Sequence, residues 1–355
     1  MTKTMKAAIY QGPRSFEIQD ISVPQPGEGE VLIKVDYCAI CGSDLHTYTK
    51  GFYIEPGQIM GHEFGGTVAA IGPDYPDPTL TVGQKVVTNP TVPCGKCSMC
   101  RKGKTNICTN ALTATLAYGK PGAFAEYVLQ SKGAFLYKLP DEVSTKEAAL
   151  FEPLAVAIHA VKKASPSLNE KVVVFGAGTI GLMISQVLKT IGCTQVIQVD
   201  ISQPRLEIAR KIGVDHIINA RNTADVVEDI SKITGPGYYG PGGAEADIVF
   251  ECAAVPETIT QALKAVRHGG KIISIAISEG DCPINVTALV QKEVSLLGSY
   301  AYTDEFEEAL DLAASGKIVL DELITDIFPL SEIQSAFERQ LDTSASVKVV
   351  VKCTE

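Results

Sequence analysis

The alternation of apolar and polar positions divides this chain into a β-rich first part and a regular strand–helix repeat. Between residues 172 and 298, short apolar runs rich in β-branched residues alternate with longer stretches of helical periodicity. Such runs are typical of strands buried on both faces of a parallel sheet. The predicted strands are residues 172–175, 195–199, 216–218, 247–252, 271–275 and 295–297. Six strands alternating with helices predict a doubly wound α/β domain with a parallel sheet.

The first 150 residues show a different pattern, in which short β-type runs are separated by glycine and proline turns. The predicted strands in this part are residues 5–10, 16–23, 30–39, 63–71, 85–88 and 122–129. Residues 145–164 form the first predicted helix, with Thr145 as its N-cap. Pro153 is expected to kink or interrupt this helix, because proline has no backbone N–H.

The pattern also predicts how the two kinds of structure are connected. After Gly298 the chain predicts helices over residues 304–315 and 330–340 and a last strand over 346–351. The glycine-rich segment 235–243 predicts a mobile loop. We therefore expect the doubly wound domain to span residues 156–298, inserted into a second domain built from residues 1–155 and 299–355.

A glycine motif follows the first predicted strand of the repeat directly. Gly176-Ala177-Gly178-Thr179-Ile180-Gly181 has the G-x-G-x-x-G spacing of a dinucleotide-binding (Rossmann) turn. Gly176 allows the tight turn, Gly178 lets the backbone approach a pyrophosphate, and Gly181 allows close packing of helix and strand. The helix that follows directs its N–H groups at the phosphates, so Thr179 and Ile180 belong to the predicted site.

Asp200 ends the second strand of the repeat and selects the cofactor. A carboxylate at this place accepts hydrogen bonds from the adenosine ribose hydroxyls. The 2′-phosphate of NADP would face that negative charge, so Asp200 predicts NAD. Arg205 raises the question of NADP, but we expect it to lie along the adenine or to pair with an acid.

Composition excludes several classes of partner. The net charge of −10 at pH 7 argues against nucleic acid and anionic membranes. We find no signal peptide and no apolar stretch of membrane-spanning length, so we expect a cytoplasmic protein without membrane contact. In that setting the ten cysteines are expected to be thiols, some of them metal ligands.

Four of the cysteines are closely spaced. Cys94, Cys97, Cys100 and Cys108 form C-x2-C-x2-C-x7-C in a loop rich in glycine and proline. Four thiolates at this spacing predict a closed, structural zinc site. Disulfides and an iron–sulfur cluster are the alternatives, and the soft ligands do not exclude the cluster. Zinc is the favoured interpretation.

A second group of metal ligands is dispersed along the chain. Cys41, His62, Glu63 and Glu152 each have an ordinary structural explanation when taken alone. Together they offer a mixed sulfur, nitrogen and oxygen set, which suits a catalytic zinc with an open or water-filled position.

These motifs, in this order, resemble the zinc-dependent medium-chain dehydrogenases. The resemblance covers nearly the whole chain, from Cys41-Gly-Ser-Asp-Leu-His to the glycine turn. Glu152 stands where other alcohol dehydrogenases have cysteine, which is similar to the polyol (sorbitol-type), threonine and 2,3-butanediol branch. The resemblance implies a GroES-like β-rich catalytic domain with an inserted Rossmann domain. It also implies two zinc ions per chain, with Cys41, His62 and Glu63 binding the catalytic one and Glu152 binding it directly or through water.

The same resemblance implies a reaction and an assembly. Zinc lowers the pKa of a bound alcohol, whose hydride then passes to NAD. Ser43 and His46 are implied as the proton relay. The family also implies a homodimer or homotetramer. We expect the substrate to be a small, uncharged polyol or vicinal diol, oxidised at a secondary hydroxyl to a ketone.

Two departures from the sorbitol-type pattern make sorbitol itself an open question. Ala301 stands at the place of an arginine that holds distal hydroxyls, and Thr47 stands where many of these enzymes have tyrosine. Tyr300 or Tyr302 is the candidate to grip the substrate instead. The alternatives are a threonine or 2,3-butanediol dehydrogenase and, from another class, a non-catalytic nucleotide-binding relative.

Overall fold

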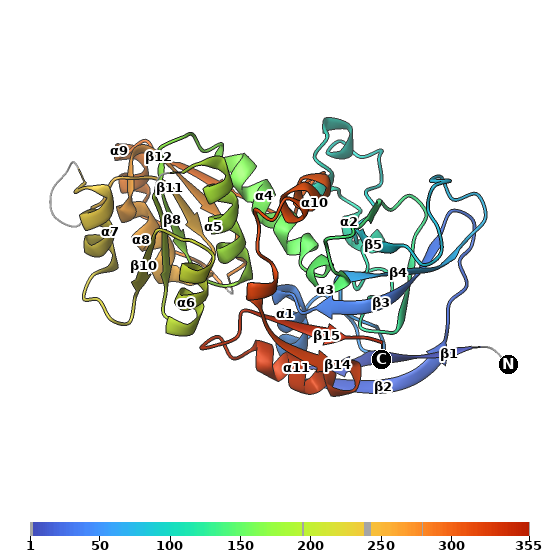
Figure 1. The fold of residues 1–355 in the computed structure, drawn as a ribbon. Coiled ribbons are helices and arrows are strands. Elements are labelled where there is room, and N and C mark those ends of the chain that lie inside the picture. Colours follow the sequence, from blue (N-terminus) through green and yellow to red (C-terminus); the bar gives the residue numbers. More distant parts are fainter. Residues whose placement is uncertain (1–2, 194, 238–242, 279, 355) are drawn as a thin grey trace.

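The computed structural model describes residues 3–193, 195–237, 243–278 and 280–354, in two parts joined by helix α4 (Phe151–Ala164) (Figure 1). One part contains a six-stranded parallel sheet in the order β10-β9-β8-β11-β12-β13. Its strands are β8 (Lys171–Phe175), β9 (Gln195–Asp200), β10 (His216–Asn219), β11 (Ala246–Glu251), β12 (Val266–Ser274) and β13 (Ser295–Gly298). This order reverses between β8 and β11, which is the doubly wound arrangement predicted from the sequence.

Alternate residues of each strand in this sheet face opposite layers of helices. Val172 and Val174 of β8 pack in one apolar core with α4 and α5, whereas Val173 and Phe175 pack in a second core with α7 and α8. Burial on both sides explains the unbroken apolar runs in the sequence. The helices of this part are α5 (Thr179–Ile191), α6 (Gln203–Lys211), α7 (Val226–Thr234), α8 (Pro256–Ala265) and α9 (Val286–Gln291). The predicted mobile loop lies outside the described residues from 238 to 242.

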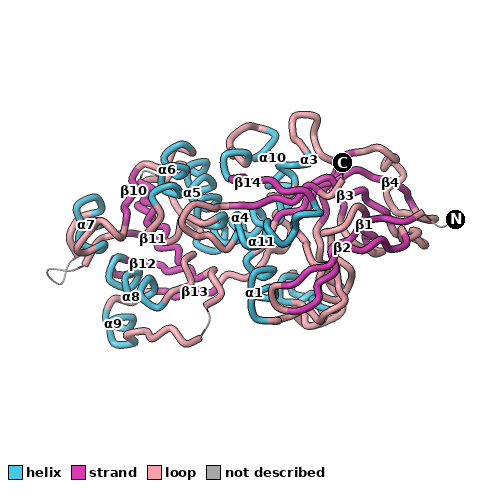
Figure 2. The backbone as a smooth tube through the Cα atoms, turned by 90° about the horizontal axis from the view of Figure 1, so that it is seen from below, coloured by secondary structure: helices cyan, strands magenta, loops and turns pink. Residues whose placement is uncertain are grey.

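The other part is built from both ends of the chain, as Figure 2 shows from below. A seven-stranded sheet runs in the order β14-β15-β3-β4-β5-β7, with β6 paired to β3, and β1 and β2 form a separate hairpin. The strands are β1 (Thr4–Gly12), β2 (Ser15–Ser22), β3 (Val31–Ala39), β4 (Glu63–Ile71), β5 (Lys85–Thr88), β6 (Tyr127–Gln130), β7 (Leu136–Lys138), β14 (Ile324–Pro329) and β15 (Lys348–Lys352). Because β15 pairs with β3, the C-terminal strand lies beside the first candidate metal ligands.

The first predicted helix is wrong in detail. Residues 145–164 form two helices, α3 (Thr145–Ala148) and α4, with Ser144 rather than Thr145 as N-cap. Ser144 and Glu147 form a reciprocal capping box, which the sequence Ser-x-x-Glu could have indicated. The expected interruption is present, because the helix breaks between α3 and α4. Pro153 is the third residue of α4, in the first turn where no N–H partner is needed, so it does not kink that helix.

Several shorter elements complete the fold. The predicted helix at 330–340 is a 3-10 turn, Leu330–Glu332, followed by α11 (Ile333–Gln340). The strand predicted at 122–129 is reduced to β6. The remaining helices are α1 (Gly42–Lys50), α2 (Ala111–Ala114) and α10 (Phe306–Ala314), with 3-10 turns at Cys100–Lys102, Thr105–Ile107 and Asp321–Leu323. None of the helices in the described ranges has the length and apolar character needed to cross a membrane.

Candidate active site

A cavity of about 710 Å³ has walls from both parts of the molecule. The part built from both ends of the chain contributes Cys41 and His62, and the connecting helix α4 contributes Glu152. The part with the parallel sheet contributes Ile180 and Ile275. Ile180 lies within the glycine motif, in the first turn of α5, and Ile275 follows the end of β12. Ligands of doubly wound domains bind at this edge of the sheet, beyond the carboxyl ends of the strands. The cavity therefore joins the predicted metal ligands to the predicted cofactor site.

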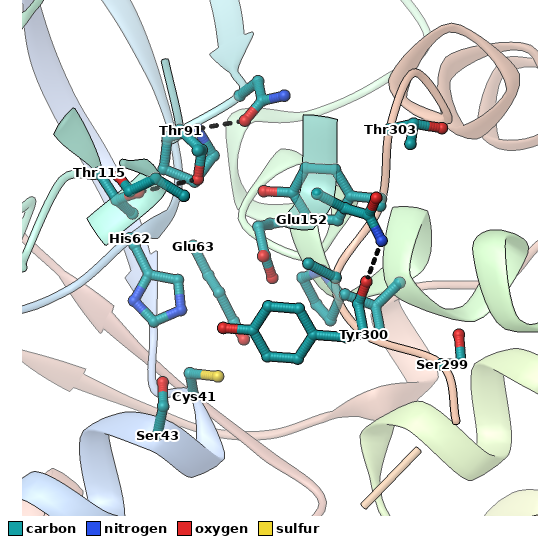
Figure 3. Close-up of a pocket in the computed structure, with 18 of the residues that line it drawn as sticks. Cys41, Ser43, His62, Glu63, Thr91, Thr115, Glu152, Ser299, Tyr300 and Thr303 are labelled. Carbon is teal, nitrogen blue, oxygen red and sulfur yellow. Dashed lines mark hydrogen bonds between the residues drawn. The ribbon is translucent and has the colours of Figure 1, made fainter. Parts of the chain in front are cut away.

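Three of the four dispersed metal-ligand candidates converge at this cavity (Figure 3). Cys41 is the N-cap of α1, and His62 and Glu63 lie at the start of β4. One ligand atom from each lies within 4.8 Å of the others. Gly61 shapes the turn before His62, with φ of +93°, and a Cβ there would lie 2.8 Å from the Cys38 sulfur. Only glycine fits that position without displacing its neighbours.

The residues around this cluster fit a cation. Within the described chain, His62 Nδ1 and Asp44 Oδ1 are buried without a hydrogen-bond partner, and they lie 3.9 Å apart. The second Asp44 oxygen accepts the backbone N–H of Cys41 at 3.0 Å. Burial alone would lower the pKa of His62, but Asp44 and Cys41 raise it well above its ordinary value. A thiol, an imidazole and a carboxylate that meet where positive charge is favoured match the preferences of Zn²⁺.

Glu152 lies beside the cluster and is not one of the three converging groups. It occupies the first turn of α4, and its carboxylate is hydrogen-bonded with the Tyr302 hydroxyl. Burial and the negative charge of Glu63 raise the pKa of Glu152, and His62 lowers it; the result is a pKa of about 7. The structure thus places Glu152 within electrostatic reach of the metal site.

Lys348 of β15 is a buried partner of Glu63 that the sequence did not reveal. Its Nζ donates to Glu63 Oε2 at 2.6 Å and to the carbonyl of Ile40 at 3.0 Å. Both side chains of the ion pair are almost fully buried. One Glu63 oxygen is therefore engaged by Lys348, which orients the carboxylate toward Cys41 and His62.

The four closely spaced cysteines also come together, in a lobe beside the cavity. The sulfur atoms of Cys94, Cys97, Cys100 and Cys108 lie within 4.8 Å of one another. Backbone N–H groups of Cys100 and Thr109 lower the pKa of Cys97 to about 5. Burial and the neighbouring Cys97 and Cys108 raise the pKa of Cys100 to about 12. The four thiols cannot all ionise without a cation, and a bound Zn²⁺ would supply that charge.

The glycine turn has the shape that a pyrophosphate requires. Gly176 has φ of +97°, and its Cβ would lie 2.9 Å from the Cys252 carbonyl. A Cβ on Gly181 would lie 1.9 Å from the Gly176 oxygen, so helix and strand pack as predicted. Gly178, by contrast, faces open space with no described atom within 4 Å of a Cβ. Asp200 accepts the N–H groups of Ala177 at 2.6 Å and Ser202 at 2.7 Å, which holds its carboxylate at the turn.

The other predicted cofactor residues have different surroundings. Ile180 lines the cavity, and the Thr179 hydroxyl donates to the Val347 carbonyl at 3.0 Å. Arg205 donates from Nε to the Ser346 carbonyl at 2.8 Å, and the carboxylates of Asp200 and Asp342 are near enough to act on its guanidinium. The contact with Ser346 fastens α6 to the segment that leads into β15.

Both predicted relay residues line the cavity, together with a residue that the sequence did not suggest. Ser43 and His46 lie on α1 at the cavity wall. The Tyr118 hydroxyl donates to Ser43 Oγ at 2.7 Å. Burial, reinforced by the negative charges of Cys41 and Asp44, raises the pKa of Tyr118. No spacing marks Tyr118, whereas Asp44 lies within the motif that begins at Cys41.

The segment after β13 forms the opposite wall. Tyr300, Ala301 and Tyr302 all line the cavity, and Ala301 has φ of +50°. Asn106 of the cysteine lobe donates to the Tyr300 carbonyl at 2.7 Å (Figure 3). Thr47 is fully buried and donates to the Ser43 carbonyl at 3.2 Å, so it supports α1. Among the described residues, no lysine or arginine lines the cavity.

Comparisons with known proteins identify the family. A model of the alcohol dehydrogenase GroES-like domain matches residues 27–141, and a model of zinc-binding dehydrogenases matches residues 179–315. Sorbitol dehydrogenase of Bacillus subtilis is 35% identical over 98% of this chain and 97% of that protein. An Escherichia coli oxidoreductase of unknown specificity superposes with a TM-score of 0.90, at 34% identity over 99% of this chain and 100% of that one. The 2R,3R-butanediol dehydrogenase of Bacillus subtilis superposes with a TM-score of 0.87, at 32% identity over 98% of this chain and 99% of that one.

These matches confirm the GroES-like and Rossmann fold class and the predicted class of enzyme, an NAD-dependent zinc dehydrogenase. The individual roles of the site residues remain predictions. Because the two models cover most of the chain and the relatives match nearly all of it, the chain belongs to the zinc-dependent medium-chain dehydrogenase family.

Proposed function

We propose that this enzyme oxidises a secondary hydroxyl of a small, uncharged polyol or vicinal diol to a ketone, with NAD as hydride acceptor. The observation that carries the proposal is the convergence of Cys41, His62 and Glu63 on a cavity that reaches the glycine turn. A metal-bound alcohol in this cavity would lie between the metal ligands and the cofactor edge of the parallel sheet. The dehydrogenases of known substrate among the reported relatives act on sorbitol and on butanediol.

The proposed roles of the chain's residues follow from their positions. Zinc held by Cys41, His62 and Glu63 would supply a Lewis acid that lowers the pKa of the substrate hydroxyl. Ser43 lies next to Tyr118 on the same wall and would accept the proton that leaves this hydroxyl. His46 lies one helical turn further along α1 and would carry the proton toward solvent.

The cofactor would be held by the glycine turn and by Asp200. Gly178 leaves room for the pyrophosphate at the N-terminus of α5, where backbone N–H groups point outward. Asp200 is already fixed by two N–H groups, so its carboxylate is ready to accept the ribose hydroxyls. We propose this carboxylate as the reason for a preference for NAD over NADP.

The lining of the cavity supports an uncharged substrate. A phosphate or a carboxylate would require a cationic partner, yet the described wall contains neither lysine nor arginine. Glu152 and the Tyr300 and Tyr302 hydroxyls can instead bond to the hydroxyls of a diol or polyol. This argument also disfavours threonine, whose carboxylate would find no counter-charge on the described wall.

The test is a series of kcat/KM measurements with NAD and with NADP. The series contains sorbitol, xylitol, 2,3-butanediol, ethanol, threonine and a sugar-alcohol phosphate. We expect an unphosphorylated polyol or diol to exceed all the others by at least about tenfold, and NAD to exceed NADP by about tenfold. A best substrate that is a primary monoalcohol, threonine or a phosphate would contradict the proposal.

Three further expectations belong to this proposal. The domain boundaries are residues 156–298 for the Rossmann domain and residues 1–155 with 299–355 for the catalytic domain, which agrees with the division of strands between the sheets. The enzyme works in the cytoplasm, consistent with its many free thiols. It assembles as a homodimer or homotetramer, by analogy with its family.

A further inference from the structure

Tyr118 contacts the proposed relay directly, although no sequence motif contains it. Its hydroxyl donates to Ser43 Oγ at 2.7 Å. Its ring lies 5.7 Å from the His62 ring and 6.3 Å from the Tyr53 ring, measured between centroids. Tyr118 therefore lines the cavity in contact with both Ser43 and a proposed metal ligand, His62; Figure 3 shows the positions of Ser43 and His62.

The backbone around Tyr118 fixes the position of its ring. The Thr115 carbonyl accepts the N–H groups of Tyr118, Gly119 and Lys120 at 3.2, 3.0 and 3.3 Å. Ala117, directly before the tyrosine, is fully buried and has φ of +70°, in the left-handed region. An alanine in this region costs on the order of 1 kcal/mol or more and persists only where the surrounding packing requires it. The packed turn thus delivers the Tyr118 hydroxyl to Ser43.

The hydrogen-bonding capacity of Ser43 gives this contact a consequence. A serine hydroxyl has one proton to donate and two lone pairs that can accept. The Tyr118 hydroxyl donates to Ser43 Oγ and so occupies one of these lone pairs. The Ser43 proton must then point away from Tyr118. Ser43 then has one free lone pair, which can accept a proton from the substrate, and its own proton, which it can release.

We propose that Tyr118 is a positioning residue for proton transfer, which orients the Ser43 hydroxyl so that it accepts the substrate proton with its free lone pair. This inference rests on the proposed function and on the role of Ser43 within it. In the transfer, the substrate O–H bond breaks, its electron pair stays on the substrate oxygen, and a new O–H bond forms at Ser43 Oγ. Ser43 passes its own proton on to the imidazole of His46, which lines the same cavity and releases the proton to solvent. Tyr118 keeps its proton throughout.

A double-mutant cycle on the purified zinc-loaded enzyme tests this coupling. The variants are Tyr118→Phe, Ser43→Ala and the double variant, assayed with the best polyol and NAD. We expect Tyr118→Phe alone to lower kcat about tenfold with little change in KM, because only orientation is lost. In the Ser43→Ala background the same change should alter kcat less than twofold, since the hydroxyl that Tyr118 orients is absent.

Tyr53→Phe is the matched control. Tyr53 lines the same cavity wall, and its ring contacts Tyr118. The hydrogen bond to Ser43, however, comes from Tyr118. The control should change kcat by the same factor in the wild-type and Ser43→Ala backgrounds, whatever it does to KM.

A second readout does not depend on activity: crystal structures of the wild type and Tyr118→Phe. We expect one Ser43 rotamer in the wild type and several in the variant, with zinc content and melting temperature preserved.

Three results would overturn the inference. Equal losses of kcat from Tyr118→Phe in both backgrounds would show that the tyrosine acts independently of Ser43. A loss confined to KM would make Tyr118 a substrate contact only. An unchanged, single Ser43 rotamer in the variant would show that packing alone orients Ser43. If the wild type oxidises no polyol or diol, both the proposed function and this inference are refuted. If the wild type is active but the effects of the two substitutions on kcat are additive, only the inference is refuted.

Discussion

The two candidate metal sites of this enzyme are built in opposite ways. The four-thiolate lobe takes all its ligands from a 15-residue segment, Cys94 to Cys108, and backbone N–H groups of the same segment donate to its sulfurs at 3.4 Å. The catalytic cluster takes Cys41 from the start of α1 and His62 and Glu63 from the start of β4, beside Glu152 of α4 and Lys348 of β15. The lobe is held by its own chain, whereas the catalytic cluster is held by the packing of the whole fold.

This difference has consequences for stability and for metal exchange. Four protein thiolates complete a tetrahedral shell, so the lobe has no place for substrate or water. The cluster of Cys41, His62 and Glu63 lines the cavity, so a metal held there would have space beside it for substrate or water. Its buried charges also need partners far away in the sequence, such as Lys348 for Glu63. We expect the catalytic cluster to exchange its metal faster and to respond to changes at distant positions.

Chelation should separate the two sites most strongly. Brief treatment with a chelator should remove the exposed catalytic zinc and lower activity by more than about a thousandfold, while the lobe zinc and the fold persist. The zinc content measured by metal analysis should then fall from two ions per chain to one. The far-ultraviolet circular dichroism spectrum should stay unchanged.

Cys41→Ser and Cys97→Ser are matched single-sulfur variants for this experiment. The first should contain only the lobe zinc and be inactive, and the second should retain the catalytic zinc but melt at a lower temperature. Fully active wild-type protein that contains one metal per chain would refute the two-site description.

The buried ion pair offers the second test. Lys348→Met should leave the Glu63 carboxylate buried without a counter-charge, which typically costs about 3–5 kcal/mol. The loss should be larger in zinc-free than in zinc-loaded protein, because a bound cation would replace part of the missing charge. Urea unfolding with and without zinc measures both values.

Lys352→Met is the control for this variant, because Lys352 lies on the same strand but is exposed. It should change the unfolding free energy by less than about 0.5 kcal/mol. Equal stabilities of the two variants would mean that β15 does not support the metal site through Lys348.

The smallest expected effect concerns Glu305, which ties the far cavity wall to α4. His159 Nδ1 lies 2.9 Å from Glu305 Oε1, and the Thr303 N–H donates to its Oε2 at 2.6 Å. Burial would raise the pKa of Glu305, but these hydrogen bonds and the charge of Lys162 lower it to about 2. A carboxylate with a depressed pKa stabilises the fold above its unfolded value of 4.5, and this contribution is lost as the pH falls toward 2.

Glu305→Gln should therefore be about 2 kcal/mol less stable than the wild type at pH 7, and this difference should vanish between about pH 5 and pH 2. Unfolding free energies measured across that range give the comparison. Glu308→Gln is the control, because Glu308 pairs with Lys162 at 2.9 Å but its side chain is 50% exposed. A constant difference between Glu305→Gln and the wild type at all pH values would exclude the ionised contact.

Features encoded in a short stretch of chain could be predicted from the sequence. The strand boundaries at β4 and β5 match the predicted ranges, because short runs of β-forming residues and the glycines near their ends are local features. The glycine turn and the four-cysteine lobe also keep their spacing in any fold, so their residues could be named in advance. The capping box at Ser144 was equally local, and it was missed in favour of Thr145.

The sequence alone determined the fold class, the family motifs, the dinucleotide turn and the ligand types of both metal sites, since each depends on residue identity and short-range spacing. Only the tertiary structure decided which distant groups meet. It placed Glu152 beside the cluster of Cys41, His62 and Glu63. It also paired Lys348 with Glu63 and brought Tyr118 to Ser43, across 285 and 75 residues of chain. These contacts follow from the pairing of β15 with β3 and from the strained turn at Ala117, and no local pattern records either one.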